Sequence, residues 1–340
     1  MPTGTYNWNE IFAVSTKYLD DKITEAFSLT SPLMDQVMKN KKYVDGGNRL
    51  AFAIDYNPAQ NIGFITGTAA DTIPTGTQQN VMPAELDWKY LQTGFSVTIQ
   101  DLNTTADSKH AITSLVTEKV KNSLASTKQF ISAALYGSAL DNANAFNGFG
   151  DIFASAGTAY AGLLDTDLGT DAAGDKIWLP QYDAASTVVD YKTIEPMITK
   201  LKTKANFAGI ENKLDYMVSK AAVLSAFKQN QQLQQRFLPA KDLAAGFDGI
   251  NVDGVIWYAD EFCGGSGTAY DLYLISSNSM KFMYKYGFDG KNSPADVSGL
   301  RIPNQPIMTH QRYITGNLAC VNRRVNGKFS ALNPAAVREA

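Results

Sequence analysis

The stretch from residue 50 to residue 136 constrains the fold of this chain more than any other part. It opens with a run in which apolar residues alternate with small or polar ones. Side chains on a strand point to opposite faces with period two, so this run predicts a strand with one apolar face. That face is formed by Leu50, Phe52, Ile54 and Tyr56. A second alternating run at residues 95–99 predicts the strand that returns and completes a hairpin.

A long polar loop separates the two predicted strands, and a long helix follows them. The loop, residues 58–83, is rich in Gly, Thr, Gln, Asn and Pro. Ordinary connections have about 4–6 residues, so a loop of this length indicates a functional role. The helix is predicted over residues 109–136, with Asp107 or Ser108 as its cap and Gly137 as its stop. Its apolar face is formed by Ile112, Val116, Val120, Leu124, Ile131 and Leu135.

The composition is that of a folded protein without a general affinity for nucleic acid. Hydrophobic residues make up 44% of the 340 residues and charged residues 19%, which excludes a disordered chain and allows two lobes. The formal net charge of −3 argues against a nucleic-acid-binding protein, because such a protein needs a basic face to neutralise phosphates. A shell whose inner face tolerates packed DNA remains compatible with this charge.

The chain offers little for redox, cofactor or membrane functions. Two cysteines, Cys263 and Cys320, cannot form a disulfide framework and indicate a reduced compartment. No apolar run reaches the length of about 18 residues expected of a membrane span. The first residues lack the pattern of a signal peptide. We therefore expect no cofactor and no association with a membrane.

The rest of the chain mixes helices and strands without regular alternation, which predicts the α+β class. Residues 1–40 are predicted as an arm with helical pieces, packed either on a neighbouring subunit or on its own domain. The excursion, residues 142–186, is predicted to be rich in loops, with short strands near 152–153 and 177–179. Later helices are predicted to start at Thr193 and Ser219, and a tight turn at Asp253-Gly254. The last strands are predicted near 271–276, 280–286, 311–317 and 318–323.

No residue pattern predicts a catalytic or metal site. Ser266 lies in the string CGGSGT, which lacks the second glycine of a G-x-S-x-G elbow, so a mobile turn is the better interpretation. The acids at 165, 167 and 171 suggest a calcium loop, but Lys176 occupies the position where a bidentate glutamate belongs. A solvated acidic turn is the better interpretation there. His110 and His310 lie far apart in the sequence, and we predict that the chain is not an enzyme.

Two features are candidates for contacts between subunits. An isolated hairpin is marginally stable in water, so the apolar face of the predicted hairpin is expected to be buried on the next subunit. The densest basic group lies near the C-terminus, where such groups more often serve subunit contacts or solubility than phosphate binding. The candidate contact residues are Leu50, Phe52, Ile54, Tyr56, Arg312, Arg323 and Arg324.

Several motifs accompany this order of elements. The long helix ends in ALYG at residues 134–137, and FNGF follows at 146–149. The runs DLYLISSNSMKFMYKYGF at 271–288 and QRYITGNLACVNRRVNGKF at 311–329 come later. With the arm, the hairpin, the long helix and the mixed lobe, these motifs resemble the major capsid protein of tailed bacteriophages, which has the Hong Kong 97-type fold. The resemblance covers nearly the whole chain.

The resemblance implies a division of the chain into named parts. The helix at 109–136 would be the spine of a peripheral domain, and the extended hairpin loop would reach over a neighbouring subunit. The axial domain would lie near the centre of each hexamer or pentamer. The parts are an N-terminal arm at 1–40, an extended hairpin loop at 41–104, a peripheral domain at 105–187 and 270–340, and an axial domain at 188–269.

The resemblance also implies a function and partners. The chain would be a structural protein that assembles with itself into hexamers and pentamers of an icosahedral head shell around double-stranded DNA. Its other expected partners are a separate scaffolding protein, a portal and a decoration protein. It would be located in the virion and assembled in the host cytoplasm.

Two departures from the family refine these expectations. Some members cross-link subunits through a lysine in the extended loop, but no lysine lies between Lys42 and Lys89 here. Some members begin with a long charged pro-segment that is removed, whereas the start of this sequence predicts no such cleavage. Two alternatives stay open. One is the shell protein of an encapsulin-type nanocompartment, and the other is a β-rich hydrolase or binding module with a catalytic acid or nucleophile in a cleft.

Overall fold

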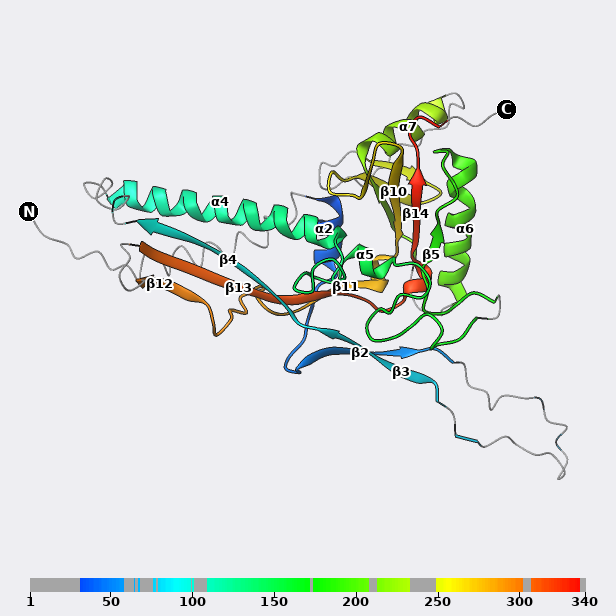
Figure 1. Cartoon of the computed structure of the whole chain (residues 1–340), viewed down its shortest axis with the longest axis horizontal. Coiled ribbons are helices and arrows are strands. Elements are labelled where there is room, and N and C mark those ends of the chain that lie inside the picture. The colour runs from blue at the N-terminus through cyan, green and yellow to red at the C-terminus, as the bar shows by residue number, and fades with distance from the viewer. Residues whose placement is uncertain are drawn as a thin grey trace, which may run out of the picture.

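The computed structural model describes residues 31–57, 64, 67, 76–77, 79–98, 100, 109–171, 174–207, 213–232, 249–301 and 307–336. It contains two sheets and a separate two-stranded hairpin, with helices packed beside them (Figure 1). One lobe consists of the first sheet and the long helix α4, and the other of the second sheet with α6 and α7. This segregated mixture confirms the α+β class.

The first sheet is organised around one long strand, β13 (Ile307–Cys320). The first part of β13 pairs with β4 (Lys89–Thr98) on one side and β12 (Val297–Arg301) on the other. Its last part pairs with β11 (Met280–Tyr286), beside which β1 (Lys42–Tyr43) runs parallel. The prediction of two successive short strands at 311–317 and 318–323 was therefore wrong, because one strand carries both.

The hairpin is formed by a different pair of strands from the pair predicted. Strand β2 (Arg49–Asp55) pairs with β3 (Val81–Asp87), and the predicted partner at residues 95–99 falls in and after β4. Strand β4 follows β3 after Trp88 and joins the first sheet instead. Pro83 lies opposite Ala53 in the hairpin. Proline is tolerated there because a two-stranded hairpin consists of edge strands only.

The longest helix, α4 (Lys109–Tyr136), has the bounds predicted from the sequence. It lies along the first sheet in Figure 1. The side chains of Val120, Leu124, Ile131 and Leu135 are buried, as the apolar pattern predicts. The remaining predicted positions, Asp107, Ser108 and the side chains of Ile112 and Val116, lie outside what the structure describes.

The end of α4 explains why the sequence motifs occur together. A Cβ on Gly148 would lie 2.5 Å from the carbonyl oxygen of Leu135 and 2.6 Å from that of Gly137, so only glycine lets FNGF approach ALYG this closely. Asn147 then exchanges hydrogen bonds with buried Asn317 of β13: its backbone N–H donates to Oδ1 at 2.9 Å, and its Oδ1 accepts from Nδ2 at 2.7 Å. Three distant motifs therefore meet at one junction.

The second sheet has seven described strands: six lie in the order β5–β14–β10–β6–β8–β7, and β9 (Gly265–Ser266) pairs with β10. Its two faces contribute to different hydrophobic cores. Tyr273 and Ile275 of β10 pack in the core beside α4, whereas Leu272 and Leu274 pack in the core of the other lobe. The six strands are β5 (Gln181–Asp183), β14 (Gly327–Leu332), β10 (Ala269–Ile275), β6 (Tyr216–Ser219), β8 (Val255–Ala259) and β7 (Gly249–Val252).

Helices α6 (Tyr191–Phe207) and α7 (Ala221–Gln232) contribute to the core of the second lobe. The start of α6 differs from the prediction, because the Oδ1 of Asp190 accepts from the N–H of Thr193 at 2.8 Å. Asp190 therefore takes the capping role expected of Thr193. The tight turn between β7 and β8 is confirmed: Asp253 and Gly254 both have positive φ, 51° and 82°.

The strands of the second sheet come from more than one part of the division that the resemblance implies. The division ends the axial domain at residue 269, yet β10 and β14 are inner strands of the sheet that contains β6, β7 and β8. Strand β5, from the excursion, pairs parallel with β14 in the same sheet. These three strands belong structurally with residues 188–269.

The excursion is irregular, but it buries many apolar side chains. It contains one short helix, α5 (Phe149–Ile152), so the predicted strand near 152–153 was wrong. Residues 177–179 form no strand either. Burial of a large apolar side chain stabilises a fold by roughly 1.5–3 kcal/mol. The buried apolar side chains of the excursion are Phe146, Phe149, Ile152, Phe153, Tyr160, Ala161, Leu163, Leu168 and Trp178.

Helix α2 (Pro32–Lys39) is the described part of the arm, and it packs on its own domain. Pro32 occupies the first turn, where proline is tolerated because the N–H that it lacks would have no carbonyl partner within the helix. Leu33, Met34 and Val37 are buried. Residues 1–30, and with them the rest of the arm prediction, lie outside the described residues. Two short 3₁₀ turns, η2 (Ser277–Ser279) and η3 (Arg323–Val325), complete the described elements.

Candidate functional site

The apolar face of the hairpin is covered by the chain itself. Leu50 and Ile54 are only 1% and 6% exposed, and Phe52 and Tyr56 pack partly buried against the same core. The N–H of Glu85 in β3 donates to the carbonyl oxygen of Ala161 in the excursion at 3.0 Å. The premise that this face finds burial only on another subunit was therefore wrong. The excursion, which is much farther along the sequence, supplies part of the covering.

The opposite face of the hairpin is the one left open. Arg49 lies within 3.1 Å of Glu85 and also within 3.1 Å of Asp87, and all three side chains are about half exposed or more. Ala51 and Ala53 lie on this face and are exposed. An approaching surface would therefore meet small side chains and one compact group of charges here.

The basic residues near the C-terminus do not form a surface patch. Arg312 and Arg323 are only 2% and 0% exposed, and Arg324 is partly buried. A nitrogen of Arg312, Nη2, donates to the carbonyl oxygen of Gly287 at 3.3 Å. A role in subunit contacts or solubility requires exposed side chains, and Arg312 and Arg323 are buried in this chain. In this conformation Arg323 has no surface to offer a neighbouring subunit.

Arg323 instead fixes the excursion from inside. Its Nε donates to Ile152 and its Nη1 to Trp178, both at 2.9 Å, while Nη2 is 3.4 Å from the carbonyl oxygens of Asp151 and Ala154. The guanidinium lies over the rings of Tyr160 and Trp178. Burial lowers the pKa of Arg323. The guanidinium of arginine is planar and has five N–H donors. It can therefore bind several surrounding carbonyl oxygens at once better than the ammonium group of a lysine.

A second set of charges ties the excursion down, and it replaces the predicted solvated acidic turn. Asp165 is only 2% exposed and pairs with Lys176 at 2.6 Å. This hydrogen bond lowers the pKa of Asp165. The lysine that argued against a calcium loop is thus the counter-ion of the first acid. Within the described residues no group of three His, Cys, Asp or Glu side chains could hold a metal ion.

Residues 171 and 175 of the excursion form ion pairs with α6. Lys204, which is 7% exposed, lies 2.8 Å from Asp171 and 2.5 Å from Asp175. The hydrogen bond from Lys204 lowers the pKa of Asp175. Lys200 adds a contact to Asp175 at 3.4 Å. These ion pairs connect the excursion, whose apolar side chains pack in the core beside α4, to α6, which contributes to the core of the second lobe.

The arm, the long helix and the second sheet meet at Asp260. Its carboxylate is 2% exposed and accepts hydrogen bonds from the hydroxyl of Ser31, the hydroxyl of Tyr136 at 2.9 Å and the N–H of Phe262 at 3.0 Å. Burial raises the pKa of Tyr136 well above its usual range. No sequence motif indicated this junction, because its residues come from three distant segments. It fixes the start of α2 against the end of α4 and the segment that follows β8.

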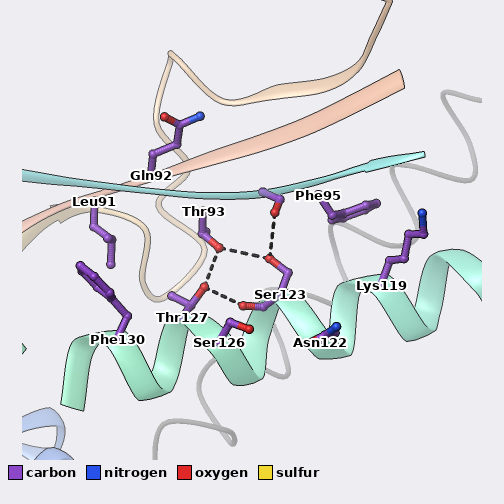
Figure 2. Close-up of a pocket in the computed structure, with 11 residues that line it drawn as sticks. Leu91, Gln92, Thr93, Phe95, Lys119, Asn122, Ser123, Ser126, Thr127 and Phe130 are labelled. Carbon is purple, nitrogen blue, oxygen red and sulfur yellow. Dashed lines mark hydrogen bonds between the residues drawn. The ribbon is translucent and has the colours of Figure 1, made fainter. Parts of the chain in front are cut away.

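A groove lies between α4 and β4, with a volume of about 630 Å³ (Figure 2). In its middle the hydroxyl groups of Thr93, Ser123 and Thr127 form a chain of hydrogen bonds. The Oγ of Ser123 also donates to the carbonyl oxygen of Gly94 at 3.4 Å. At one end Leu91 and Phe130 face each other (Figure 2). The groove is therefore polar in the middle and apolar at this end.

The weak catalytic candidates are not brought together. Ser266 is exposed in the tight hairpin of β9 and β10, in agreement with the turn expected there. His310 is 4% exposed on β13, with its ring centroid 5.3 Å from that of Phe95. Burial lowers the pKa of His310. His110 lies in α4, but its side chain is outside the described residues. Neither Ser266 nor His310 takes part in a described nucleophile–base pair.

Cys263 and Cys320 are both buried free thiols. Burial raises the pKa of Cys263 above its usual range and that of Cys320 to about 12. A thiol with a raised pKa is a poor nucleophile, because the thiolate is the reactive form. Among the described helices none combines the length and the apolar character needed to cross a bilayer.

No protein-family model matches the sequence, and no curated protein matches it. The fold is similar to that of a chain in the Cyanophage A-1(L) capsid asymmetric unit, with a TM-score of 0.65 at 13% sequence identity. This match covers 88% of the present chain and 92% of the cyanophage chain.

Two further shells have the same fold. A capsid chain of a native GTA particle matches with a TM-score of 0.57 at 15% identity, over 87% of this chain and 90% of that chain. The holo-SrpI encapsulin of Synechococcus elongatus PCC 7942 matches with a TM-score of 0.56 at 8% identity, over 89% of each chain. At these identities the likeness establishes the fold. It covers both lobes, since so little of each chain is left outside it.

Proposed function

Because this chain has the Hong Kong 97-type fold, we propose that it is the major capsid protein of a tailed bacteriophage. It assembles with itself into hexamers and pentamers that form an icosahedral head around double-stranded DNA. The observation that carries this proposal is the match of nearly the whole chain to a phage capsid chain, at a TM-score of 0.65. The protein is a structural component of the virion, assembled in the host cytoplasm.

We also propose a division of the chain into four parts, with one adjustment to the division that the resemblance implies. The arm comprises residues 1–40 and the extended hairpin loop residues 41–104. The peripheral domain is built from residues 105–187 and 270–340, with α4 as its spine. The axial domain is residues 188–269, to which we add strands β5, β10 and β14 because they share its sheet.

The proposed contact between subunits uses the exposed charged face of the hairpin and the sequence that joins its two strands. Leu50 and Ile54 are occupied within the chain, so we shift the contact to the charged face at Arg49 and to the loop after Tyr56. The hairpin closes before this loop, since the N–H of Tyr56 donates to Asn80 at 3.0 Å. The loop can thus vary without disturbing strand pairing.

A separate scaffolding protein, a portal and a decoration protein are proposed partners. No described residue identifies their binding sites, so co-expression is the direct approach. The cross-linking chemistry of some family members is not proposed for this hairpin, which has no lysine between Lys42 and Lys89.

The test is electron microscopy of the purified protein, expressed alone and together with a candidate scaffold. Closed shells, tubes or capsomer rings are expected in at least one of the two preparations. A matched variant replaces residues 59–78 with a short Gly-Ser turn. It is expected to keep the circular dichroism and unfolding midpoint of the parent but to lose closed shells. A monodisperse monomer of the parent under both conditions would refute the proposal.

A second candidate is the shell of an encapsulin-type nanocompartment, and the match to the SrpI encapsulin favours it. The same micrographs separate the two, because a nanocompartment is smaller than a phage head and encloses protein cargo. Nuclease-resistant DNA inside the particles is expected for the head, and a co-purifying protein for the nanocompartment. A hydrolase remains the alternative if neither shell forms, and it would be tested at Ser266.

A further inference from the structure

Strand β4 is an edge strand of the first sheet in the part of the chain that the structure describes. Its one described strand partner is β13, which pairs with it along its whole length. The carbonyl oxygens of Gly94 and Ser96 accept hydrogen bonds from side chains of α4, at 3.4 Å and 3.1 Å. The backbone groups of successive residues in a strand alternate between its two edges, so Gln92 also has its N–H and C=O on the edge away from β13. We call this the open edge of β4.

The open edge of β4 lacks the features that usually protect an edge strand. Native edge strands are commonly short, or they carry charges or prolines that prevent pairing with another chain. Strand β4 has ten residues, whereas a common strand has about five or six. Residues 90–98 contain neither a charged residue nor a proline. Gln92, Gly94 and Ser96 are all exposed. An edge of this kind can accept a further strand.

The α4–β4 groove runs along the open edge. Gly94 has no side chain, so it lines the groove with its backbone. Gln92 also lines the groove, although its side chain points away from α4 in Figure 2. Residues 91–96 of the strand cover about 17 Å at 3.4 Å per residue. Residues 119–130 of the helix cover about 16 Å at 1.5 Å per residue. The groove is therefore long enough for about five extended residues.

The two ends of the groove favour different side chains. At one end Phe130, which is 59% exposed, faces Leu91 (Figure 2). At the other end the ammonium group of Lys119 donates to the carbonyl oxygen of Ser96 at 3.1 Å. Among the described residues that line the groove none is acidic. A ligand with an apolar group at the first end and a carboxylate at the second would match both.

We propose that β4 accepts an extended segment of another protein, which lies in the α4–β4 groove as an added strand. Residues four apart in a strand share a face and lie about 14 Å from each other. In the antiparallel arrangement, which is the more stable one, the segment brings a carboxylate to Lys119. Four residues later it brings an apolar side chain to Leu91 and Phe130. Such a partner is distinct from the neighbouring subunits of the proposed shell.

Two other occupants fit the open edge less well. A second copy could pair its own β4 with this one, but residues 89–98 contain no carboxylate to meet Lys119. Double-stranded DNA could contact Lys119 and the hydroxyl groups of the groove through its phosphates. Its stacked bases would leave the exposed ring of Phe130 without a matching surface. An extended peptide uses the edge, the charge and the apolar end together.

The test uses a fluorescent peptide and the unassembled full-length chain. The peptide Thr-Asp-Val-Thr-Val-Leu-Thr has its aspartate and its leucine on one face, and its binding is followed by fluorescence anisotropy. Gln92→Pro removes one N–H from the open edge, where proline is tolerated, and is expected to weaken binding about tenfold. The matched control Gln92→Ala keeps this N–H, so its affinity should stay within about twofold of the parent.

A second pair of variants keeps the test decisive if Gln92→Pro does not fold, which circular dichroism would show. Phe130→Ala removes the exposed ring at the apolar end and is expected to weaken binding about tenfold. Its control is Gln129→Ala, since Gln129 is exposed on α4 but does not line the groove. The control should bind within about twofold of the parent. Equal affinities within each pair of folded variants would refute the proposal.

Hydrogen exchange, measured residue by residue, tests whether the bound peptide adds a strand. The peptide is expected to slow exchange of the Gln92, Gly94 and Ser96 amides about tenfold or more, while Leu91 and Thr93, which face β13, change less. No slowing at saturating peptide would overturn the proposal.

Three further outcomes of the exchange experiment would assign the open edge to another occupant, and each overturns the proposal. Protection in the dilute chain alone would assign the edge to a segment of the same chain. Protection that rises with chain concentration would assign it to a second copy, and protection by a short DNA duplex would assign it to nucleic acid. None of these measurements depends on whether shells form.

Discussion

The hairpin has regular secondary structure, whereas the excursion is irregular and is nevertheless held more firmly. The hairpin, β2 with β3, has a continuous ladder from Arg49–Asp87 to Asp55–Val81, but one of its faces is open to solvent. The excursion has almost no regular structure, yet it buries two of the largest side chains of the chain, Tyr160 and Trp178. It is further fixed by Arg323 and by Lys204.

This contrast teaches that regular secondary structure and firm attachment are separate properties. A strand pair satisfies its backbone groups locally but depends on something else to cover its apolar face. An irregular loop must satisfy its carbonyls with side chains, and Arg323 does this for four of them. The excursion in turn covers the hairpin through Ala161. Damage to the excursion is therefore expected to reach the hairpin.

The largest effect is expected from Arg323→Met. The change removes the guanidinium that donates to four carbonyl oxygens, of which that of Asp151 keeps a second donor in the N–H of Ala154, so the free energy of unfolding should fall by about 3–5 kcal/mol. Urea unfolding of the unassembled chain would measure it. The matched control is Arg324→Met, whose one described ion pair is 3.9 Å long, and it should cost less than about 1 kcal/mol. Equal losses in both variants would show that the excursion is not held by Arg323.

The next largest effect is expected from Leu50→Ala in the hairpin. Leu50 is 1% exposed, and loss of a buried leucine side chain should lower the free energy of unfolding by about 2–4 kcal/mol. The companion variant Ala51→Ser, on the open face, should change it by less than about 0.5 kcal/mol. If Leu50→Ala leaves the unassembled chain unaffected but prevents shell assembly, the face is used between subunits after all.

Acid should loosen the excursion before the hairpin. The folded-state pKa of Asp165 and of Asp175 is lowered from 3.8, so each contributes stability above that value. This contribution is lost as the pH falls from about 4 through the folded-state pKa. Hydrogen exchange of residues 165–178 should therefore accelerate in that range while residues 49–55 change less. In Asp165→Asn the acceleration should be weaker, and an unchanged profile would contradict the assignment to this carboxylate.

The smallest effect is expected from Arg49→Gln. Its pairs with Glu85 and Asp87 are exposed to solvent, so the free energy of unfolding should change by less than about 1 kcal/mol. Shell assembly is the sharper measurement, because the same residue lies on the face proposed for a neighbouring subunit. A loss of closed shells with an unchanged unfolding curve would support that contact. Normal assembly would shift the contact to the loop after Tyr56.

Some of the site followed from the sequence, and the reasons can be given residue by residue. The tight turn at Asp253-Gly254 was predicted because positive φ at two adjacent positions depends only on those residues. The sequence places Arg323 in a basic group, for which it suggests a role in subunit contacts or solubility and not a buried one. Burial of a charge depends on whether other segments supply acceptors, and Ile152 and Trp178 supply them from more than 140 residues away. Asp260 gave no signal for the same reason.

The sequence by itself determined the local elements: α4 with its end at Gly137, the strand at β2 and the mixture of helices and strands. These depend on periodicity and on preferences of neighbouring residues. Only the tertiary structure decided that β2 pairs with β3, that β10 separates two cores and that the excursion covers the hairpin. Such contacts join residues far apart in the chain, so their free energy depends on packing that no local pattern records.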